Sequence, residues 1–202
     1  MNNTALLLLS TLILSFNALA NQRTAIVTID GIEHSISLNK ETKIKIGSKE
    51  HLINIKLSEY STFKIDGMSF SYNSNMTYNE DTSNPNVSMW NIDGNSNVIM
   101  VQKYQTNITT DFLTDMIKQQ FKNMKAKVEV ENSILKYKKS NLKGLKLKIQ
   151  LGDIFLSQEI YTTIRNGKTV ALIIQDTLND DRSNSKEYKN GITLLKKTLN
   201  IK

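Results

Sequence analysis

The sequence predicts an α+β protein in which an antiparallel β-sheet is covered by two main helices and preceded by N-terminal β-hairpins. Most of the chain from Thr24 onward alternates apolar and polar residues and is broken by short turns containing glycine, a pattern typical of antiparallel strands. Two stretches, 112–124 and 185–199, carry apolar residues at spacings of three and four instead, which is typical of amphipathic helices.

The first twenty residues are predicted to be a secretory signal peptide. An apolar run from Ala5 to Leu19 ends in Ala18-Leu19-Ala20, which fits a signal-peptidase site of the A-x-A type. The run is about 15 residues, short of the roughly 20 that a membrane-spanning helix needs, so no stable membrane anchor is expected. The chain has no cysteine, and an exported protein without disulfides fits the bacterial periplasm best.

After the signal peptide, residues 21–65 are expected to form an N-terminal β-hairpin region. Asp30-Gly31 separates two alternating runs and suits a type I′ turn, and Gly47-Ser48 separates two more. A further strand pair, Thr62 to Ile65 and Met68 to Tyr72, is expected across Asp66-Gly67.

Residues 66–202 are expected to form the sheet and helix domain. Residues 73–86 are polar and contain the only proline, Pro85, so they are predicted to be an exposed loop. Residues 87–92 and 98–104 should form a hairpin. A helix capped by Thr109 or Thr110 should follow, with Phe112, Leu113, Met116, Ile117, Gln120, Phe121 and Met124 along one face.

Four strands and a closing helix complete the predicted domain. The strands are 128–137, 143–151, 154–164 and 169–177, with tight turns at Gly152-Asp153 and Asn166-Gly167. The final helix should start at Asn184 with Glu187 in a capping box. Gly191 interrupts this helix and is expected to mark a close approach of the helix to the sheet.

From Gly67 onward, the order of elements resembles the PsbP and Mog1-like fold. The likeness rests on the strand Met68-Ser69-Phe70-Ser71-Tyr72, the strand with Trp90, the pairing of residues 158–161 with 170–174, and the helix with Tyr188. Asn73 stands where that family usually has proline. The resemblance implies a non-catalytic scaffold, since members bind proteins such as a small GTPase or a photosystem, and some exported bacterial proteins of this shape are immunity proteins against secreted effectors.

The positive charge of the chain does not indicate specific nucleic-acid binding. The net charge is +7 and the pI is about 9.4, but only Arg23, Arg165 and Arg182 are arginine. The lysines are scattered among abundant asparagine and isoleucine, which indicates a general composition bias more than a designed patch.

No motif for catalysis, a cofactor or a metal ion is found. The two histidines, His34 and His51, lie in the predicted N-terminal hairpins on apolar faces and are interpreted as partly buried structural residues. If the hairpins packed together, the two imidazoles would supply half of a metal site, but no further ligands accompany them. We therefore expect no enzyme activity, no cofactor and no metal.

Acidic residues cluster in two predicted loops, and these are the candidate binding residues. Glu80 and Asp81 lie in the long loop, and Asp176, Asp180 and Asp181 lie before the last helix. They are interpreted as ordinary solvated charges of surface loops. A calcium site is not indicated, because the spacing of an EF-hand is missing. The alternative is that they contact a basic partner, because binding residues concentrate on loops held by a rigid sheet.

The function predicted from these observations is that of an exported, periplasmic protein-binding module, of which an immunity protein neutralising a secreted effector is one form. An envelope accessory or assembly factor, or a carrier of a small ligand, is the alternative. The expected partner is another protein, not nucleic acid, and the oligomeric state is left open.

Overall fold

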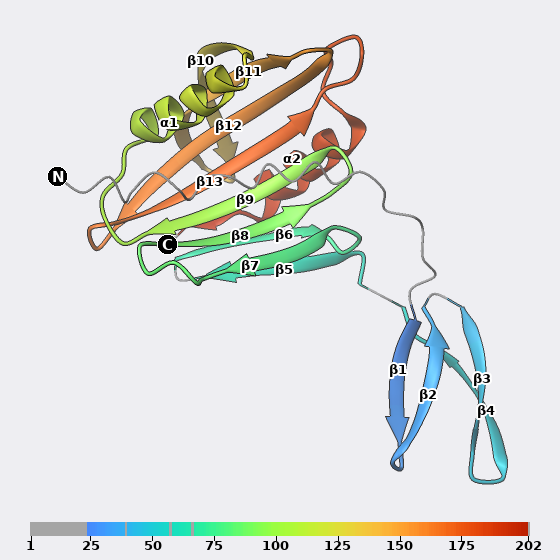
Figure 1. Cartoon of the computed structure of the whole chain (residues 1–202). Coiled ribbons are helices and arrows are strands. Elements are labelled where there is room, and N and C mark those ends of the chain that lie inside the picture. Colours follow the sequence, from blue (N-terminus) through green and yellow to red (C-terminus); the bar gives the residue numbers. More distant parts are fainter. Residues whose placement is uncertain (1–23, 39, 57, 66, 202) are drawn as a thin grey trace. The chain divides into compact units, whose positions relative to one another are not determined.

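The structure is a computed structural model that describes residues 24–38, 40–56, 58–65 and 67–201 (Figure 1). The predicted signal peptide lies outside the described residues. The chain divides into two compact units between Leu57 and Ser58. The boundary predicted from the sequence lies after residue 65, but the strand Tyr60–Ile65 pairs with the strand that follows it and so belongs to the second unit.

The first unit consists of two antiparallel hairpins, as the turn dipeptides predicted. The first hairpin pairs β1 (Thr24–Ile29) with β2 (Ile32–Ser37), and the second pairs β3 (Glu41–Ile46) with β4 (Lys49–Asn54). Asp30, Gly31 and Gly47 take the positive φ angles that these turns require. Among the described residues of this unit, the buried apolar ones are Ile36 on β2 and Ile44 on β3.

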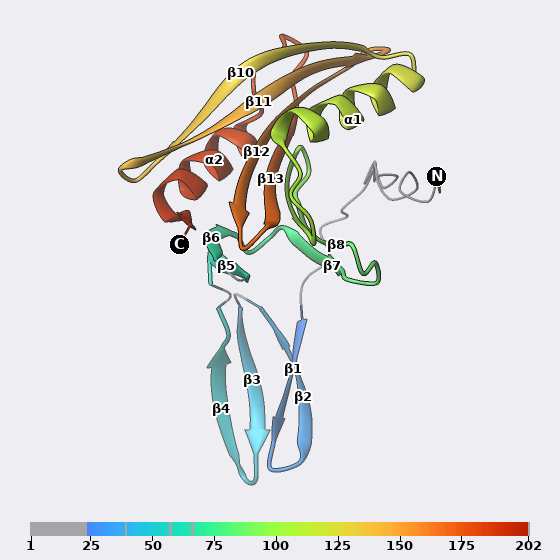
Figure 2. The same cartoon turned by 90° about the vertical axis from the view of Figure 1, so that its left-hand side faces the viewer.

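The second unit is built on a seven-stranded antiparallel sheet in the order β10-β11-β12-β13-β9-β8-β7 (Figures 1 and 2). Its strands are β7 (Thr77–Asp81), β8 (Val87–Asp93), β9 (Asn97–Tyr104), β10 (Lys127–Tyr137), β11 (Ser140–Leu151), β12 (Ile154–Arg165) and β13 (Lys168–Thr177). The hairpin of β8 with β9 and the meander from β10 to β13 were predicted from alternation and turn residues, and both are confirmed.

A second, three-stranded sheet packs on one face of the large sheet. It has the order β14-β6-β5 and contains β5 (Tyr60–Ile65), β6 (Met68–Asn73) and β14 (Asn200–Ile201). Phe63 on β5 contacts Trp90 on β8 edge-on, with 6.1 Å between ring centroids, and both are buried in the main core. Trp90 is therefore a core residue, as its place in an alternating strand predicted.

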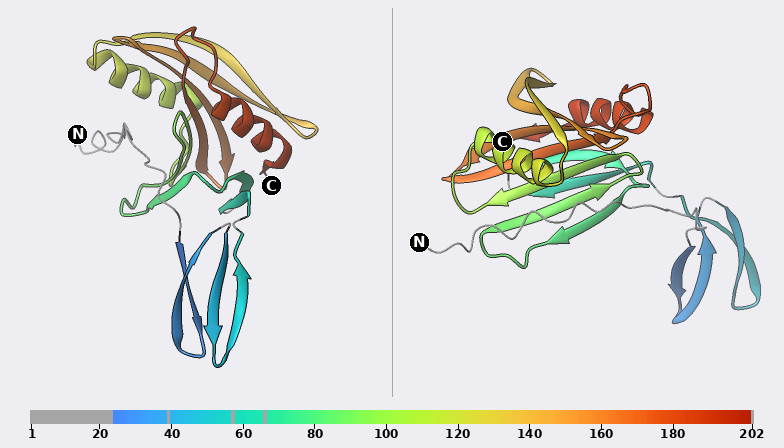
Figure 3. Two further views of the ribbon diagram at one scale, coloured as in Figure 1. Left: turned by 90° about the vertical axis from the view of Figure 1, so that its right-hand side faces the viewer. Right: turned by 45° about the horizontal axis from the view of Figure 1, so that its top comes forward.

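The two helices lie on opposite faces of the large sheet (Figures 1 and 3). Helix α1 (Thr110–Asn123) starts after the N-cap Thr109 and packs Leu113, Ile117 and Phe121 onto β10, β11 and β12. Helix α2 (Lys186–Thr198) packs on β6, β9 and β10. Phe112 and Met124, predicted on the buried face of α1, are exposed because the packed stripe is narrower than expected.

The predicted fold class is wrong. The structure is mostly β, with 59% strand and 16% helix, and the large sheet is not simply covered by two helices. The physical reason is the short sheet of β5, β6 and β14, whose apolar residues Phe63, Met68 and Phe70 cover the part of the core that helices were expected to cover.

Two local predictions are also corrected. Residues 73–86 are not a continuous loop, because β7 pairs with β8 as the edge strand of the large sheet. The last helix is capped by Ser185, whose side chain accepts the amide of Tyr188, in place of Asn184. Among the described residues, no helix is long and apolar enough to cross a membrane.

Candidate functional site

The first pair of predicted binding residues lies on the exposed edge of the large sheet. Glu80 and Asp81 are on β7, every residue of which is exposed. Glu80 accepts a hydrogen bond from the Tyr78 hydroxyl at 3.1 Å. Asp81 accepts from the hydroxyl and the amide of Ser83, and these bonds hold the pKa of Asp81 below its usual value. Both carboxylates are therefore exposed to solvent, and each accepts hydrogen bonds from a residue two positions away in the sequence.

The second predicted cluster is divided between the interior and the surface. Asp176 is not in a loop: it lies on β13 and is fully buried, where it accepts hydrogen bonds from the Ser185 amide and the Asn184 side chain. Asp180 and Asp181 are exposed in the following loop, and Asp181 caps the amide of Ser183. The structure does not bring the two clusters together, because β9 and β8 separate β13 from β7.

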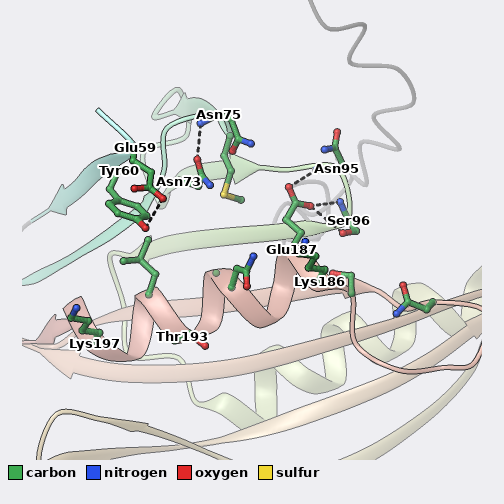
Figure 4. Close-up of a pocket in the computed structure, with 16 residues that line it drawn as sticks. Glu59, Tyr60, Asn73, Asn75, Asn95, Ser96, Lys186, Glu187, Thr193 and Lys197 are labelled. Atoms are coloured by element: carbon green, nitrogen blue, oxygen red, sulfur yellow. Dashed lines mark hydrogen bonds between the residues drawn. The ribbon is translucent and has the colours of Figure 1, made fainter. Parts of the chain in front are cut away.

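An open groove runs along the exposed side of α2 (Figure 4). Its volume is about 800 Å³, and one wall is α2 from Lys186 to Lys197. The other wall consists of residues in the ranges 59–60, 73–76 and 95–96, and it includes the side-chain amides of Asn73, Asn75 and Asn95. Small-molecule sites are mostly apolar with a few polar groups, so this lining is unusual for such a site.

Glu187 on α2 holds the turn at residues 95–96, which lines the groove, in place. Its carboxylate accepts hydrogen bonds from the amides of Asn95, Ser96 and Asn97 and from the Ser96 hydroxyl, at 2.6 to 3.2 Å (Figure 4). The predicted capping box is therefore wrong, since Glu187 binds the turn between β8 and β9 and not the start of its own helix. The turn passes close enough that a Cβ at Gly94 would lie 2.5 Å from the Glu187 carboxylate.

A buried polar cluster joins α2 to the large sheet. Glu159 on β12 accepts hydrogen bonds from the hydroxyls of Tyr161 and Tyr188, at 2.5 and 2.7 Å. Lys146 lies 3.7 Å from the same carboxylate, and Ser133 on β10 hydrogen-bonds the Tyr161 hydroxyl. Burial and the Glu159 carboxylate raise the pKa of both tyrosines far above the ordinary 10.0, so the phenols stay protonated and act as donors.

A row of polar side chains crosses three strands beside this cluster. Ser157, Asp176 and Asn97 are register partners on β12, β13 and β9, and all three are at least 98% buried. Asn97 faces Gly191, where a Cβ would lie 2.6 Å from its amide nitrogen. This confirms that Gly191 marks a close approach of α2 to the sheet.

The two histidines of the first unit lie on different hairpins, His34 on β2 and His51 on β4. His34 is half-buried opposite Val27, and His51 is exposed opposite Ile44, so the prediction that both are partly buried is wrong for His51. Among the described residues, no group of three His, Cys, Asp or Glu side chains is placed to hold a metal ion.

The N-terminal hairpins present open strand edges and exposed apolar side chains. Each hairpin is a two-stranded sheet, so within the part of the chain that the structure describes each of its strands has one edge without a hydrogen-bonded strand neighbour. Ile26, Ile32 and Leu52 are 68%, 62% and 58% exposed. The exposure of these three side chains was not predicted, although the outward position of Ile26 and Leu52 in the alternation is visible in the sequence.

No family model matches the chain, and no curated protein matches it either. The resemblance to the PsbP and Mog1-like fold therefore stays a prediction from the order of elements.

Proposed function

We propose that this protein is an exported, non-catalytic protein-binding module that uses its N-terminal hairpins to bind an extended segment of a partner protein. The observation that carries the proposal is the combination of open strand edges with exposed Ile26, Ile32 and Leu52 in one small unit. An open edge offers backbone donors and acceptors to an added strand, and pockets for alternate side chains then give specificity.

The small core of the first unit supports a binding role. A single two-stranded hairpin is marginally stable in water, and the buried apolar residues that the structure describes in these hairpins are Ile36 and Ile44. An added strand from a partner would bury Ile26 or Leu52 and pair an open edge at the same time. At about 25 cal/mol per Å² of apolar surface, such burial contributes to affinity without any new polar contact.

The polar interior of the second unit supports a non-catalytic role. The cluster of Glu159, Tyr161, Tyr188 and Lys146 contains the groups that acid and base chemistry uses, but it is packed between α2 and the sheet. The pKa values of both tyrosines are raised by burial, which disfavours the phenolate that a nucleophile or base would need. The cluster therefore stabilises the helix against the sheet.

Two forms of the module differ in affinity. An immunity protein that neutralises a secreted effector in the periplasm is expected to bind one partner tightly, whereas an envelope accessory or assembly factor binds weakly and transiently.

A carrier of a small ligand is a second candidate, and the groove along α2 favours it because its volume of about 800 Å³ suits a small molecule. We prefer protein binding to ligand carriage, because the groove lining is rich in amides whereas small-molecule sites are mostly apolar.

The test uses the chain as bait against periplasm and culture supernatant of the producing cell, followed by mass spectrometry and titration of the captured protein. A bait carrying Ile26→Asn and Leu52→Asn removes the apolar contacts of the hairpins. A matched bait carrying Phe112→Asn and Met124→Asn removes two exposed apolar side chains of α1.

We expect the hairpin variant to bind the partner at least about tenfold more weakly than the original chain, which corresponds to about 1.4 kcal/mol. The α1 variant is expected to bind as the original chain does. Equal binding by all three baits would place the interface elsewhere. Failure to capture any stoichiometric partner would contradict protein binding itself.

A further inference from the structure

The hairpin of β10 and β11 carries a concentration of positive charge. No Asp or Glu occurs between Asn132 and Gly152, whereas six lysines do. Two of the six are neutralised: Lys146 lies 3.7 Å from Glu159, and Lys148 lies 2.7 Å from Glu131. The remaining four are all exposed, and none of them forms an ion pair with a described residue; they are Lys136, Lys138, Lys139 and Lys143.

These four lysines surround the turn of the hairpin, and we call them the lysine tip. Lys138 takes a φ of 47° in the turn, and Lys136 and Lys143 flank it on the two strands. β10 and β11 are among the longest strands of the sheet, and their shared turn projects past α2 in two views (Figures 2 and 3). The tip is therefore accessible to a broad, flat partner.

An exposed apolar residue lies beside the lysine tip. Ile134 is 54% exposed and is the register partner of Lys143, so the two side chains share one face of the hairpin. On the opposite face, Tyr137 and Leu142 are half-buried against the main core. The core thus fixes the hairpin from one side, while Ile134 and its neighbouring lysines face solvent.

We propose that the lysine tip and Ile134 dock this protein onto the surface of an anionic lipid bilayer. Each lysine near such a surface contributes about 1 kcal/mol through attraction to acidic headgroups, and an apolar side chain between lysines inserts at the boundary of headgroups and acyl chains. The composition favours a bilayer over an acidic protein, because protein interfaces are enriched in Arg, Tyr and Trp and depleted in Lys. This surface binding differs from a spanning anchor and does not depend on the proposed partner protein.

The first experiment measures cosedimentation of the full chain with vesicles of phosphatidylcholine alone and with vesicles containing equal amounts of phosphatidylcholine and phosphatidylglycerol. The test variant changes the four lysines of the tip to glutamine. The control variant has the same net charge, because it changes four other exposed lysines to glutamine: Lys64, Lys122, Lys125 and Lys189. Thermal unfolding of both variants checks that the fold is kept.

We expect the original chain to bind the anionic vesicles more tightly than the neutral ones, and added salt to weaken the difference. The tip variant should lose on the order of a thousandfold in this anion-dependent binding, given about 1 kcal/mol from each of four lysines. The control variant should lose much less. Equal losses in the two variants would overturn the proposal, and so would the absence of anion-dependent binding by the original chain.

A second experiment locates the contact and identifies the kind of polyanion. Trp90 is the only tryptophan and is buried, so Ile134→Trp adds a reporter at the tip, and Tyr78→Trp on β7 adds a control reporter. Anionic vesicles should shift the emission of the Ile134→Trp protein to the blue and leave the Tyr78→Trp protein unchanged. A shift of both or of neither would overturn the docking geometry, and tight binding of polyglutamate without vesicle binding would assign the tip to an acidic polypeptide instead.

Discussion

Glu187 on α2 and Ser96 in the turn between β8 and β9 are joined by two hydrogen bonds, from the Ser96 amide at 2.6 Å and from its hydroxyl at 3.0 Å. The residues are 91 positions apart, and the amides of Asn95 and Asn97 complete the set of donors. Because a carboxylate that accepts several hydrogen bonds is costly to replace, this contact fixes the start of α2 against one end of the sheet.

Replacing Glu187 is expected to destabilise the second unit. Glu187→Ala should lower the free energy of unfolding by about 1 to 3 kcal/mol, because three backbone amides lose a charged acceptor. Glu187→Gln should cost less, since its carbonyl oxygen still accepts. Urea unfolding checks this against Lys186→Ala, an exposed neighbour on the same helix. A Glu187→Ala protein as stable as the Lys186→Ala protein would show that the contact contributes nothing.

Gly144 on β11 is expected to tolerate no side chain. A Cβ there would lie 2.2 Å from the carbonyl oxygen of Ile160 and 2.4 Å from the Tyr161 ring. Gly144→Ala should therefore destabilise the protein by about 2 kcal/mol or more, as overpacking of a core does. Lys143→Ala, one position away and exposed, should stay within about 0.5 kcal/mol of the original chain.

The double variant Gly144→Ala, Tyr161→Ala separates the two clashes. It should recover little stability, because the carbonyl of Ile160 still obstructs the Cβ and the buried ring is lost. Full recovery in denaturant unfolding would mean that the ring alone excludes a side chain at position 144.

The hydroxyl of Tyr188 is expected to matter for stability through Glu159. Tyr188→Phe leaves the ring in place but removes the donor 2.7 Å from the buried carboxylate. The loss should be about 1.5 to 3 kcal/mol, which is typical of a hydrogen bond to a charged group. Tyr72→Phe serves as the control, because Tyr72 is half-buried against the same core. Equal thermal stability of the two variants would exclude a contribution from the hydrogen bond.

The protein is expected to lose stability at alkaline pH through its buried tyrosines. Burial raises the pKa of Tyr104 to about 12 and raises those of Tyr161 and Tyr188 further. The unfolded tyrosines release protons near pH 10 while the folded ones keep them, so the folded state is favoured fully below pH 10 and progressively less above it. Each retained proton lowers the free energy of unfolding by about 1.4 kcal/mol per pH unit in this window.

Chemical unfolding at a series of pH values between 10 and 12 measures the slope of the free energy of unfolding against pH. Tyr104→Phe removes one titrating group. The free energy of unfolding should therefore fall less steeply with pH, by up to about 1.4 kcal/mol per pH unit. A slope identical to that of the original chain would contradict the raised pKa of Tyr104.

The parts of the fold that follow from local pattern could be predicted from the sequence. Alternation and turn residues such as Asn166-Gly167 were sufficient for the meander from β10 to β13, and Thr109 was among the predicted caps of α1. β7 was missed because its residues are exposed on both faces at the sheet edge, so they show no apolar alternation. Edge strands of this kind carry little pattern.

The parts that depend on distant contacts could not be predicted. Glu187 has the spacing of a capping box, and only the arrival of the turn at residues 95–97 redirects its carboxylate. Asp176 was grouped with the loop charges Asp180 and Asp181 although the predicted strand 169–177 already contained it, because the pattern does not show that Asn184 and Ser185 return to bind its carboxylate. The covering of the core by β5 and β6 likewise depends on a second sheet, and this is why the expected α+β class was wrong.

Hydrogen exchange of the backbone amides, with and without the captured partner, tests the central claim most directly. If the N-terminal hairpins accept a strand, exchange should slow within residues 24–54 when the partner binds and stay unchanged in β13, which already has a strand on each side. Protection confined to residues 58–201, with the hairpins unchanged, would contradict binding by their open edges.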